Sequence, residues 1–492
     1  MRDFCFGRLE VVGMASFGRR KILIDADYVD ESNLLEVLGK ALAVHSQNAR
    51  DIHHLYDVYR GRQEVLRRTK DVRPEINNKL LINHANEIVS FKVSYLLSDP
   101  IAYVSRSAND VTDKVNQLNE MMFLNNKAAR DKEIADDFTV CGTAYRMALP
   151  NDRVGDDEPP FVLYTLNPLR TFVAYSSGLG EKQLFSVHYV RKANKNEIGR
   201  KTDAVYSIYT DTMFYEVRDW EIVKAVPHYL GMNPIIEYVN NNARIGAFEV
   251  VETLLDAMNV LASNRVDATE QAVQALTVFK NCDINSEDFD RLKQKGALKI
   301  KSSDGIQSDV YMLTSDLNQT DQQVLMDALY DEVLRVTGMP SQSTGNTSDS
   351  SNNGAVIVRN GWYNAEARAK DTELLWRESE GHFLKLVLKI CRDMGGLDLK
   401  LSDVTLKFTR RNYEDLLVRS QVLTTMLANP MIDPKLAFNH CGMFVDSEEA
   451  YRSSMNWYEK NKAEAEKKAA EMNDVNGSGK PNGSDKQDQP EE

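Results

Sequence analysis

The chain has 492 residues, more than a single hydrophobic core usually supports, so we expect several subdomains. Hydrophobic residues make up 42% of it, which favours a folded protein, and no apolar run approaches the roughly 20 residues that a membrane-spanning helix needs. Its 60 Lys and Arg against 73 Asp and Glu give a net charge of −13, which argues against tight, static binding to nucleic-acid phosphates.

The first third of the chain is predicted to be mainly helical. Its opening residues lack the basic-then-apolar order of a secretory signal, and Met14 could be an alternative start. Apolar residues at helical spacing predict four helices, and a β-rich run beyond Asp99-Pro100 predicts a short strand. The helices cover residues 34–59, 77–97, 110–124 and 127–141, and the strand covers 101–105.

A β-rich region follows, from Gly142 to about Tyr238. Short runs of β-branched and aromatic residues alternate there with Gly, Asn and Asp, which predicts antiparallel strands joined by turns. The predicted strands cover residues 161–166, 171–175, 184–190, 204–210 and 213–217.

The segment 246–274 is predicted to be a helix with an acidic stripe. Its polar residues step by three or four, so they lie along one face. The stripe consists of Glu249, Glu252, Asp256, Asn259, Ser263, Asp267, Glu270 and Gln274. We expect this face to present negative charge to water while the others pack on neighbours. A solvated helix face is the ordinary explanation for such a stripe.

A small insert, residues 275–315, reads as strand, helix, strand and strand. A second helix over 321–337 ends at Gly338-Met339-Pro340, which is a clear stop signal. Two helices that flank a small insert predict a stalk with a tip. Asp327 and Asp331 lie one turn apart on the second helix and continue the acidic theme.

The last third begins with SQSTGNTSDSSNNG, which is too polar to bury itself and predicts a mobile loop. A long helix over 355–394 follows, with Gly381 as the candidate kink point. One or two strands are predicted over 397–408, then helices over 412–428, 434–440 and 446–470. Beyond Glu471 the composition predicts disorder.

No pattern in the sequence indicates an enzyme. GSGKP at 477–481 lacks the spacing of a phosphate-binding loop, and His53-His54 has no paired carboxylate motif. Asp136-Asp137 and Asp156-Asp157 could hold magnesium, but adjacent carboxylates are ordinary on surfaces. Five scattered cysteines without a CxxC pair predict reduced thiols and no zinc site. We therefore expect no catalytic residue, no metal and no cofactor.

Three segments and the order of elements resemble a known family. The first is INNKLLINHANEIVSFKVSYLLSDPIAY, residues 76–103, preceded by Tyr59-Arg60-Gly61; the second is HYLGMNPIIEYVNNNARIGAFEVVETLLDAMNVLAS, residues 228–263; the third is the polar loop that leads into NGAVIVRNG. With them the chain resembles, over about residues 30–460, the portal or head–tail connector proteins of long-tailed double-stranded DNA phages, of the type common in phages of Gram-positive bacteria.

This resemblance implies an α+β, predominantly helical portal fold with wing, stem, clip and crown regions that assembles as a ring. The implied division is an N-terminal arm (1–30), wing (31–245), stem helix (246–274), clip (275–315), second stem helix (316–340), tunnel loop (341–354), a long helix returning to the wing (355–409), crown (410–470) and a disordered tail (471–492).

The resemblance also assigns roles to residues. Glu249, Glu252, Asp256, Asp267, Glu270, Asp327 and Asp331 would line the channel, where negative charge opposes adhesion of phosphates. The tunnel loop, with Ser343, Thr344, Asn346, Ser348, Asn352 and Asn353, would touch DNA weakly and without sequence preference.

The implied partners are further copies of the chain in a dodecameric ring, double-stranded DNA, the terminase large subunit, head-completion or adaptor proteins, and the major capsid and scaffolding proteins. The protein would be assembled in the host cytoplasm, without a membrane, and would act at the portal vertex of the virion. Terminase would supply the ATP hydrolysis.

Two alternatives remain open at this point. Another virion structural oligomer, such as an adaptor or minor capsid protein, would also lack catalytic motifs but should not show the stem, clip, stem and loop order. A metal-dependent nuclease would use scattered carboxylates, and an assay with magnesium and plasmid DNA would reveal it.

Overall fold

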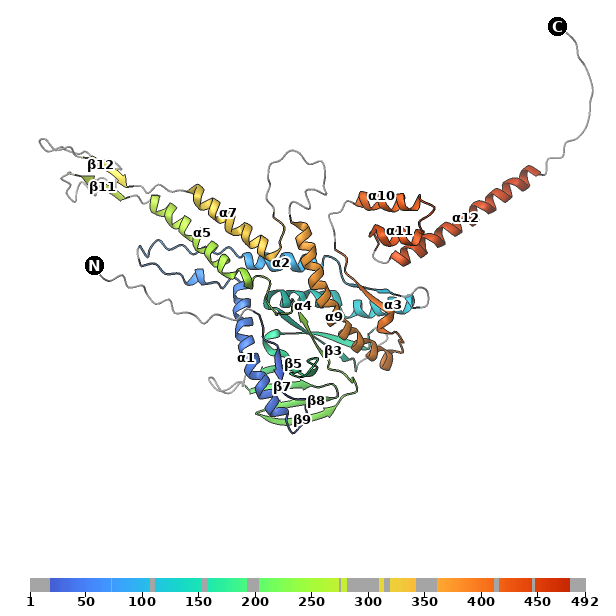
Figure 1. Ribbon diagram of the computed structural model, residues 1–492, viewed down its shortest axis with the longest axis horizontal. Helices are drawn as coiled ribbons and strands as arrows, with labels where there is room; N and C mark the ends of the chain where they lie inside the picture. Colours follow the sequence, from blue (N-terminus) through green and yellow to red (C-terminus); the bar gives the residue numbers. More distant parts are fainter. Residues whose placement is uncertain are drawn as a thin grey trace, which may run out of the picture. The chain divides into compact units, whose positions relative to one another are not determined.

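The computed structural model describes the chain over most of its length. The described residues are 18–71, 73–106, 111–152, 158–192, 203–273, 276–280, 309–313, 319–341, 361–410, 416–444 and 447–477. The chain divides into two compact units, one of residues 1–98 with 120–401 and one of residues 99–119 with 402–492. The predicted α+β fold with predominant helix is confirmed (Figure 1). None of the described helices is long and apolar enough to cross a membrane.

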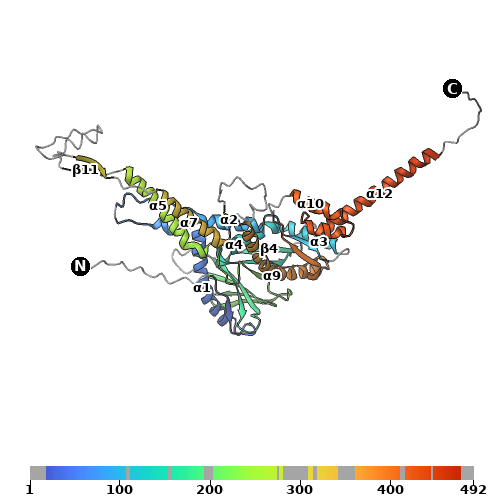
Figure 2. The same ribbon diagram turned by 45° about the horizontal axis from the view of Figure 1, so that its top comes forward.

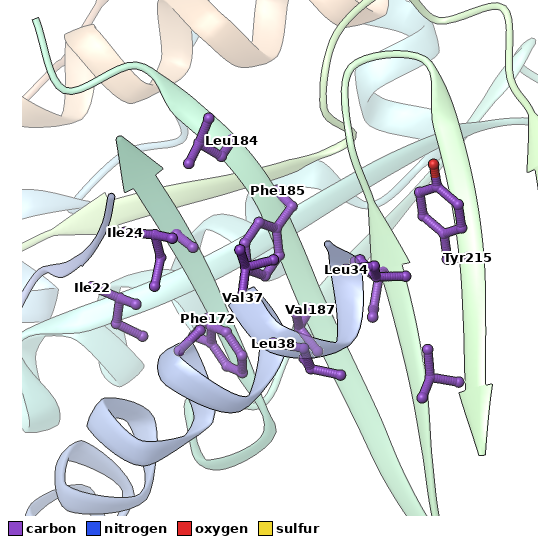
Figure 3. Packing of buried hydrophobic residues seen from close by; sticks show 14 residues of the cluster. Ile22, Ile24, Leu34, Val37, Leu38, Phe172, Leu184, Phe185, Val187 and Tyr215 are labelled. Atoms are coloured by element: carbon purple, nitrogen blue, oxygen red, sulfur yellow. The ribbon is translucent and has the colours of Figure 1, made fainter. Parts of the chain in front are cut away.

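A six-stranded sheet and the helix α1 (Leu34–Tyr59) form one core of the first unit. The strand order is β1 (Ile22–Ile24), β5 (Thr171–Ser176), β6 (Gln183–Lys192), β7 (Asp203–Tyr209), β8 (Met213–Arg218) and β9 (Glu221–Pro227). Only the β1–β5 pairing among these is parallel. α1 places Leu34, Val37 and Leu38 on one face, and they pack on Phe172, Phe185 and Val187 of the sheet (Figure 3).

The prediction of α1 is confirmed at both ends. The strand β1 lies within the predicted N-terminal arm, where the sequence pattern had not indicated a strand. Such a short strand shows too few alternations for a pattern to reveal it, and its pairing with β5 is a long-range contact.

A three-stranded antiparallel sheet forms the second core, with β3 (Thr143–Pro150) between β10 (Ile235–Val239) and β4 (Phe161–Leu166). The helices α4 (Lys127–Cys141) and α9 (Trp362–Gly395) pack on it. Trp376 of α9 is buried, and its ring meets those of Phe138 and Tyr238 edge to face, with centroids 5.5 and 5.2 Å away. α9 therefore contributes a large part of this core.

Four buried charged side chains join α4, β3 and α9, and we call them the buried charge cluster. They are Lys127, Asp131, Arg146 and Glu380. Lys127 Nζ lies 2.6 Å from Asp131 Oδ2 and 2.9 Å from Glu380 Oε1. Arg146 donates to Asp131 and, over 3.1 Å, to Glu380. Two cations thus meet two anions, which is the arrangement that buried charges require.

A helical hairpin follows the second sheet. It consists of η3 (Glu249–Val251), α5 (Glu252–Val273), the antiparallel strands β11 (Leu276–Lys280) and β12 (Asp309–Leu313), and α7 (Gln319–Thr337). α5 and α7 run side by side (Figures 1 and 2). The predicted outer strands of the insert are confirmed, whereas its predicted helix over 286–294 and strand over 297–301 lie outside the described residues.

The helix predicted over 77–97 is shorter than expected. α2 spans His84–Leu96, because Asn83 caps it by accepting from the backbone N–H of Asn86. The residues before Asn83 take up no helix and bond to α5, as described below. Two short 3-10 helices, η1 (Glu64–Arg67) and η2 (Pro168–Arg170), complete the first unit's described elements.

Among its described residues, the second unit contains a two-stranded antiparallel sheet, β2 (Ala102–Ser105) with β13 (Val404–Lys407), and three whole helices. These are α10 (Leu416–Leu427), α11 (Pro434–Cys441) and α12 (Ser447–Gly477). Phe438 stacks on Phe444 and meets Tyr451 edge to face. α12 continues to Gly477, past the predicted start of the disordered tail at Glu471. α3 (Thr112–Leu124) and η4 (Leu401–Asp403) span the boundaries between the units.

Candidate functional site

The hairpin of α5 and α7 carries all seven carboxylates that the sequence singled out. The two helices contact each other directly, and Arg265 of α5 donates to Gln323 Oε1 of α7 over 2.7 Å. Gln323 in turn donates to Asp327 Oδ1 over 2.6 Å. The sequence-predicted residues therefore lie on one local structure, but their side chains differ in what they contact.

Half of the polar stripe is bonded to an extended segment of the same chain, residues 78–82, namely Asn259, Ser263, Asp267 and Glu270. The backbone N–H groups of Asn78, Leu80 and Ile82 donate to Asp267 (2.7 Å), Ser263 (3.0 Å) and Asn259 (2.8 Å). An extended chain advances about 6.6 Å in two residues, and a helix advances about 6 Å in four. Alternate N–H groups of the segment therefore meet successive acceptors of the helix.

The expectation that this whole stripe faces water is wrong for Glu249, Asn259, Ser263 and Asp267, which are buried. The reason is that an isolated extended segment needs acceptors for its backbone, and a helix face with acceptors every four residues supplies them. From the sequence, such a face looks the same as a solvated one. Asn259 also donates from Nδ2 to Gln63 Oε1 over 2.6 Å, which closes the contact.

Asp267 is the charged centre of this contact. Its carboxylate lies 2.7 Å from Lys70 Nζ and 3.2 Å from Arg68, with only 3% of its side chain exposed. Burial by itself raises the pKa of Asp267, but the hydrogen bonds from Lys70 and Asn78 outweigh it and hold that pKa below its ordinary value. Asp267 is therefore a charged structural anchor.

Glu249 has a similar anchoring role at the other end of the stripe. Its carboxylate accepts from the backbone N–H groups of Gly18 (2.9 Å) and Gly246 (2.8 Å), and Arg19 donates to it over 2.6 Å. These bonds connect the start of the hairpin to the residues just before β1. Neither Glu249 nor Asp267 offers its carboxylate to water.

The other five carboxylates are at least partly exposed. Glu252 meets His54 Nε2 at 2.5 Å and raises the pKa of His54. Partial burial, together with the nearby Glu252, raises the pKa of Asp256. Glu270 accepts from Asn78 Nδ2 over 2.9 Å, while Asp327 and Asp331 of α7 are exposed.

The hairpin also carries exposed apolar side chains. Val250 and Val260 are 46% and 41% exposed, and Val324 and Leu325 of α7 are 62% and 50% exposed. The sequence pattern did not indicate this surface, because it assigned the apolar residues to packing within the chain.

The tunnel-loop residues Ser343, Thr344, Asn346, Ser348, Asn352 and Asn353 lie outside the described residues. Pro340 and Gly361, the described residues on either side of residues 342–360, contact each other. A Cβ atom placed on Gly361 would lie 3.7 Å from Pro340 Cα. The chain thus leaves α7 and enters α9 at one point.

In the part of the chain that the structure describes, no group of three or more His, Cys, Asp or Glu could hold a metal ion. Asp137 accepts a hydrogen bond from Tyr56, and Asp136 lies 3.5 Å from Lys132. Asp156-Asp157 lies outside the described residues.

The chain matches the family described as phage portal protein, SPP1 Gp6-like, over residues 38–474. Among solved structures, it is similar to a chain from the neck of an empty GTA particle computed with C6 symmetry, at 14% identity over 73% of this chain and 90% of that one, with a TM-score of 0.45. It is also similar to a chain from the virion of a native gene transfer agent particle, at 12% identity over 80% of this chain and 94% of that one, with a TM-score of 0.45. No curated protein matches it.

Proposed function

Because the chain belongs to the phage portal protein family, SPP1 Gp6-like, it is a portal subunit of a virion, and we propose here how its elements serve DNA passage. The observation that carries the function is the family match over residues 38–474. It favours a portal over the adaptor or minor capsid protein that the sequence alone left open. Portal proteins are structural proteins, and we propose that this chain catalyses no reaction of its own.

The working state in this proposal is a closed ring, with twelve copies in the virion. The exposed apolar residues Val250, Val260, Val324 and Leu325 support it, because a second hairpin that packs on them would remove them from water. Such a contact joins different surfaces of neighbouring subunits. When each subunit is rotated from the last by a fraction of a full turn, repetition of the contact gives a closed ring.

In this ring, α5 and α7 would form the stem around the channel. Asp327 and Asp331 are the exposed carboxylates that would face DNA, with Glu252, Asp256 and Glu270 as partly exposed neighbours. Glu249 and Asp267 support the stem from within the subunit instead. Negative charge on the wall would oppose adhesion of the phosphates and let the duplex slide.

The remaining regions would bind other proteins of the particle. The clip, residues 275–315, would dock the terminase large subunit during packaging and head-completion or adaptor proteins afterwards. The wing and crown would meet the major capsid and scaffolding proteins during assembly in the host cytoplasm. ATP hydrolysis would belong to the terminase.

The ring is tested by negative-stain imaging of the purified full chain with a matched pair of variants. Wild type should give rings with a central hole. Leu325→Glu should give monomers or small oligomers, because it places a charge in the proposed contact. Leu436→Glu on α11 changes a leucine of equal exposure, 49% against 50%, and should leave the rings intact. Wild-type monomers or open filaments at every salt concentration would contradict the ring.

The tunnel loop is tested by deletion of residues 344–351. The deletion should leave the rings intact and impair DNA packaging, and normal filling of heads would refute the role of the loop.

Incubation of wild type with magnesium and plasmid DNA should show no cleavage, and cleavage would support the nuclease alternative.

A further inference from the structure

A small pocket lies where Gly338, at the C-terminal end of α7, meets α2 and the first turns of α9. Its volume is about 40 Å³, which is enough for a small group of atoms, and it opens to the surface. Lys92 of α2 and Arg368 of α9 both line it.

The pocket lies at the root of the tunnel loop. Gly338, which ends α7 with φ +72°, is one of its lining residues. The side chain of Arg368 lies over this glycine, so a Cβ atom there would approach Arg368 Cγ to 3.0 Å. Pro340 follows Gly338 by two residues, and Gly361, which contacts Pro340, precedes the lining residue Ala365 by four.

The two cations have no counter-charge among the described residues. Among the residues that the structure describes, no partner accepts a hydrogen bond or forms an ion pair with the side chain of Lys92 or of Arg368. No Asp or Glu lines the pocket. Burial, followed by repulsion from Arg368, lowers the pKa of Lys92 to about 8. We call these two residues the cation pair.

Such an arrangement is unfavourable within the subunit alone. Two like charges repel, and a partly buried ammonium without an acceptor loses hydration. A guanidinium and an ammonium that converge on an open pocket instead suit an oxyanion, which accepts hydrogen bonds from both. A bound anion would remove both penalties at once.

We propose that Lys92 and Arg368 form a binding site for a phosphate group of the DNA backbone at the root of the tunnel loop. This rests on the proposed function, in which the loop projects toward the duplex. The position favours a DNA phosphate over a carboxylate of a second copy, because the lining residue Gly338 lies three residues before the start of that loop.

With this site, the electrostatic contact with DNA would come from the cation pair and not from the tunnel loop. Residues 341–354 contain no Lys or Arg, so the loop itself can make only uncharged or repulsive contacts with DNA. The cation pair would add one weak, sequence-blind electrostatic contact for each subunit. Such contacts hold a duplex without stopping it, because each one is screened by salt and is easily exchanged.

The test uses the full chain as wild type, as the double variant Lys92→Met with Arg368→Gln, and as the control Lys370→Met. Lys370 lies on the same helix, is exposed and already faces Glu366 at 3.6 Å. Thermal unfolding is first measured with increasing inorganic phosphate against equal ionic strength of chloride. Wild type and control should gain the same phosphate-dependent rise in Tm, and the double variant should lose it, with at least about tenfold weaker phosphate binding. A retained rise in the double variant overturns the site.

DNA packaging into heads then identifies the source of the phosphate. The double variant should form rings and package with reduced efficiency and a weaker dependence on salt, whereas the control should match wild type. Lost phosphate binding with unchanged packaging overturns DNA as the ligand. Failure of the double variant alone to form rings also overturns it, since the pair would then bind a carboxylate of a second copy. If wild type itself forms no rings, the proposed function fails, while the phosphate titration still decides whether the site binds an anion.

Discussion

Two groups of charged side chains involve α9, and they differ in whether their charges are paired. The buried charge cluster sets Lys127 and Arg146 against Asp131 and Glu380, so every charge has a partner. The cation pair, Lys92 and Arg368, has no acid among the residues that line its pocket. The first group stabilises the packing of α9 on the sheet. The second is unfavourable until something else binds, and this marks it as a place for a ligand rather than for structure.

The largest expected effect comes from breaking the cluster. Glu380→Gln leaves Lys127 and Arg146 with a single carboxylate, and an uncompensated buried charge costs about 3–5 kcal/mol. Tm of the purified protein should therefore fall strongly. Glu378→Gln, an exposed carboxylate two residues earlier, should leave Tm unchanged.

A second variant shows whether charge balance is the cause. Adding Lys127→Met to Glu380→Gln again equalises cations and anions, so the double variant should recover part of the lost Tm. No recovery would mean that side-chain shape, and not charge, sets the cost.

The next effect concerns Asp267, whose carboxylate is as buried as the cluster but whose partners Arg68 and Lys70 are partly exposed. Asp267→Asn keeps an acceptor for the Asn78 N–H but loses the charge that Lys70 and Arg68 face, so we expect a loss of about 1–3 kcal/mol. Asp331→Asn on α7, an exposed position, serves as the control in the same thermal unfolding measurement. Equal Tm values for the two variants would remove Asp267 from its anchoring role.

Removal of a charge from the cation pair should raise the stability of the protein, whereas removal of a charge from the cluster lowers it. Lys92→Met removes an unpaired charge and should raise stability by about 1–2 kcal/mol at pH 7. The folded-state pKa of about 8 lies below the ordinary 10.5, so the penalty is complete below pH 8 and disappears as pH rises toward 10.5. The gain in Tm should therefore be larger at pH 7 than at pH 9.5. A fall in Tm would show that Lys92 has a partner.

The smallest expected effect concerns Asp137, a carboxylate whose hydrogen bond from Tyr56 does not compensate for its burial. Burial raises its pKa from 3.8 to about 6, although Tyr56 donates a hydrogen bond to it. The penalty is complete above pH 6 and disappears as pH falls toward 3.8. Asp137→Asn keeps an acceptor for Tyr56 and should raise stability by about 1 kcal/mol at pH 7 and by little at pH 4.5. A gain that is independent of pH would contradict this explanation.

Much of the fold could be predicted from local patterns. α1, α4 and β4 were predicted with the residue bounds that the structure shows. The family resemblance was carried chiefly by residues 76–103 and 228–263, and the structure gives it a physical basis. Asn78, Leu80 and Ile82 of the first segment bond to α5, where Asn259 and Ser263 of the second lie.

What the sequence by itself determined is the family, the fold class and most helices and strands, because hydrophobic periodicity and stop signals are local properties of the chain. Only the tertiary structure decided what each polar side chain does. Glu249 and Asp267 were expected to face water but are buried anchors, and Lys92, which no sequence pattern singled out, lines a pocket without an acid among its lining residues. The reason is that the role of a charge depends on its partners, and these partners come from segments far apart in the sequence.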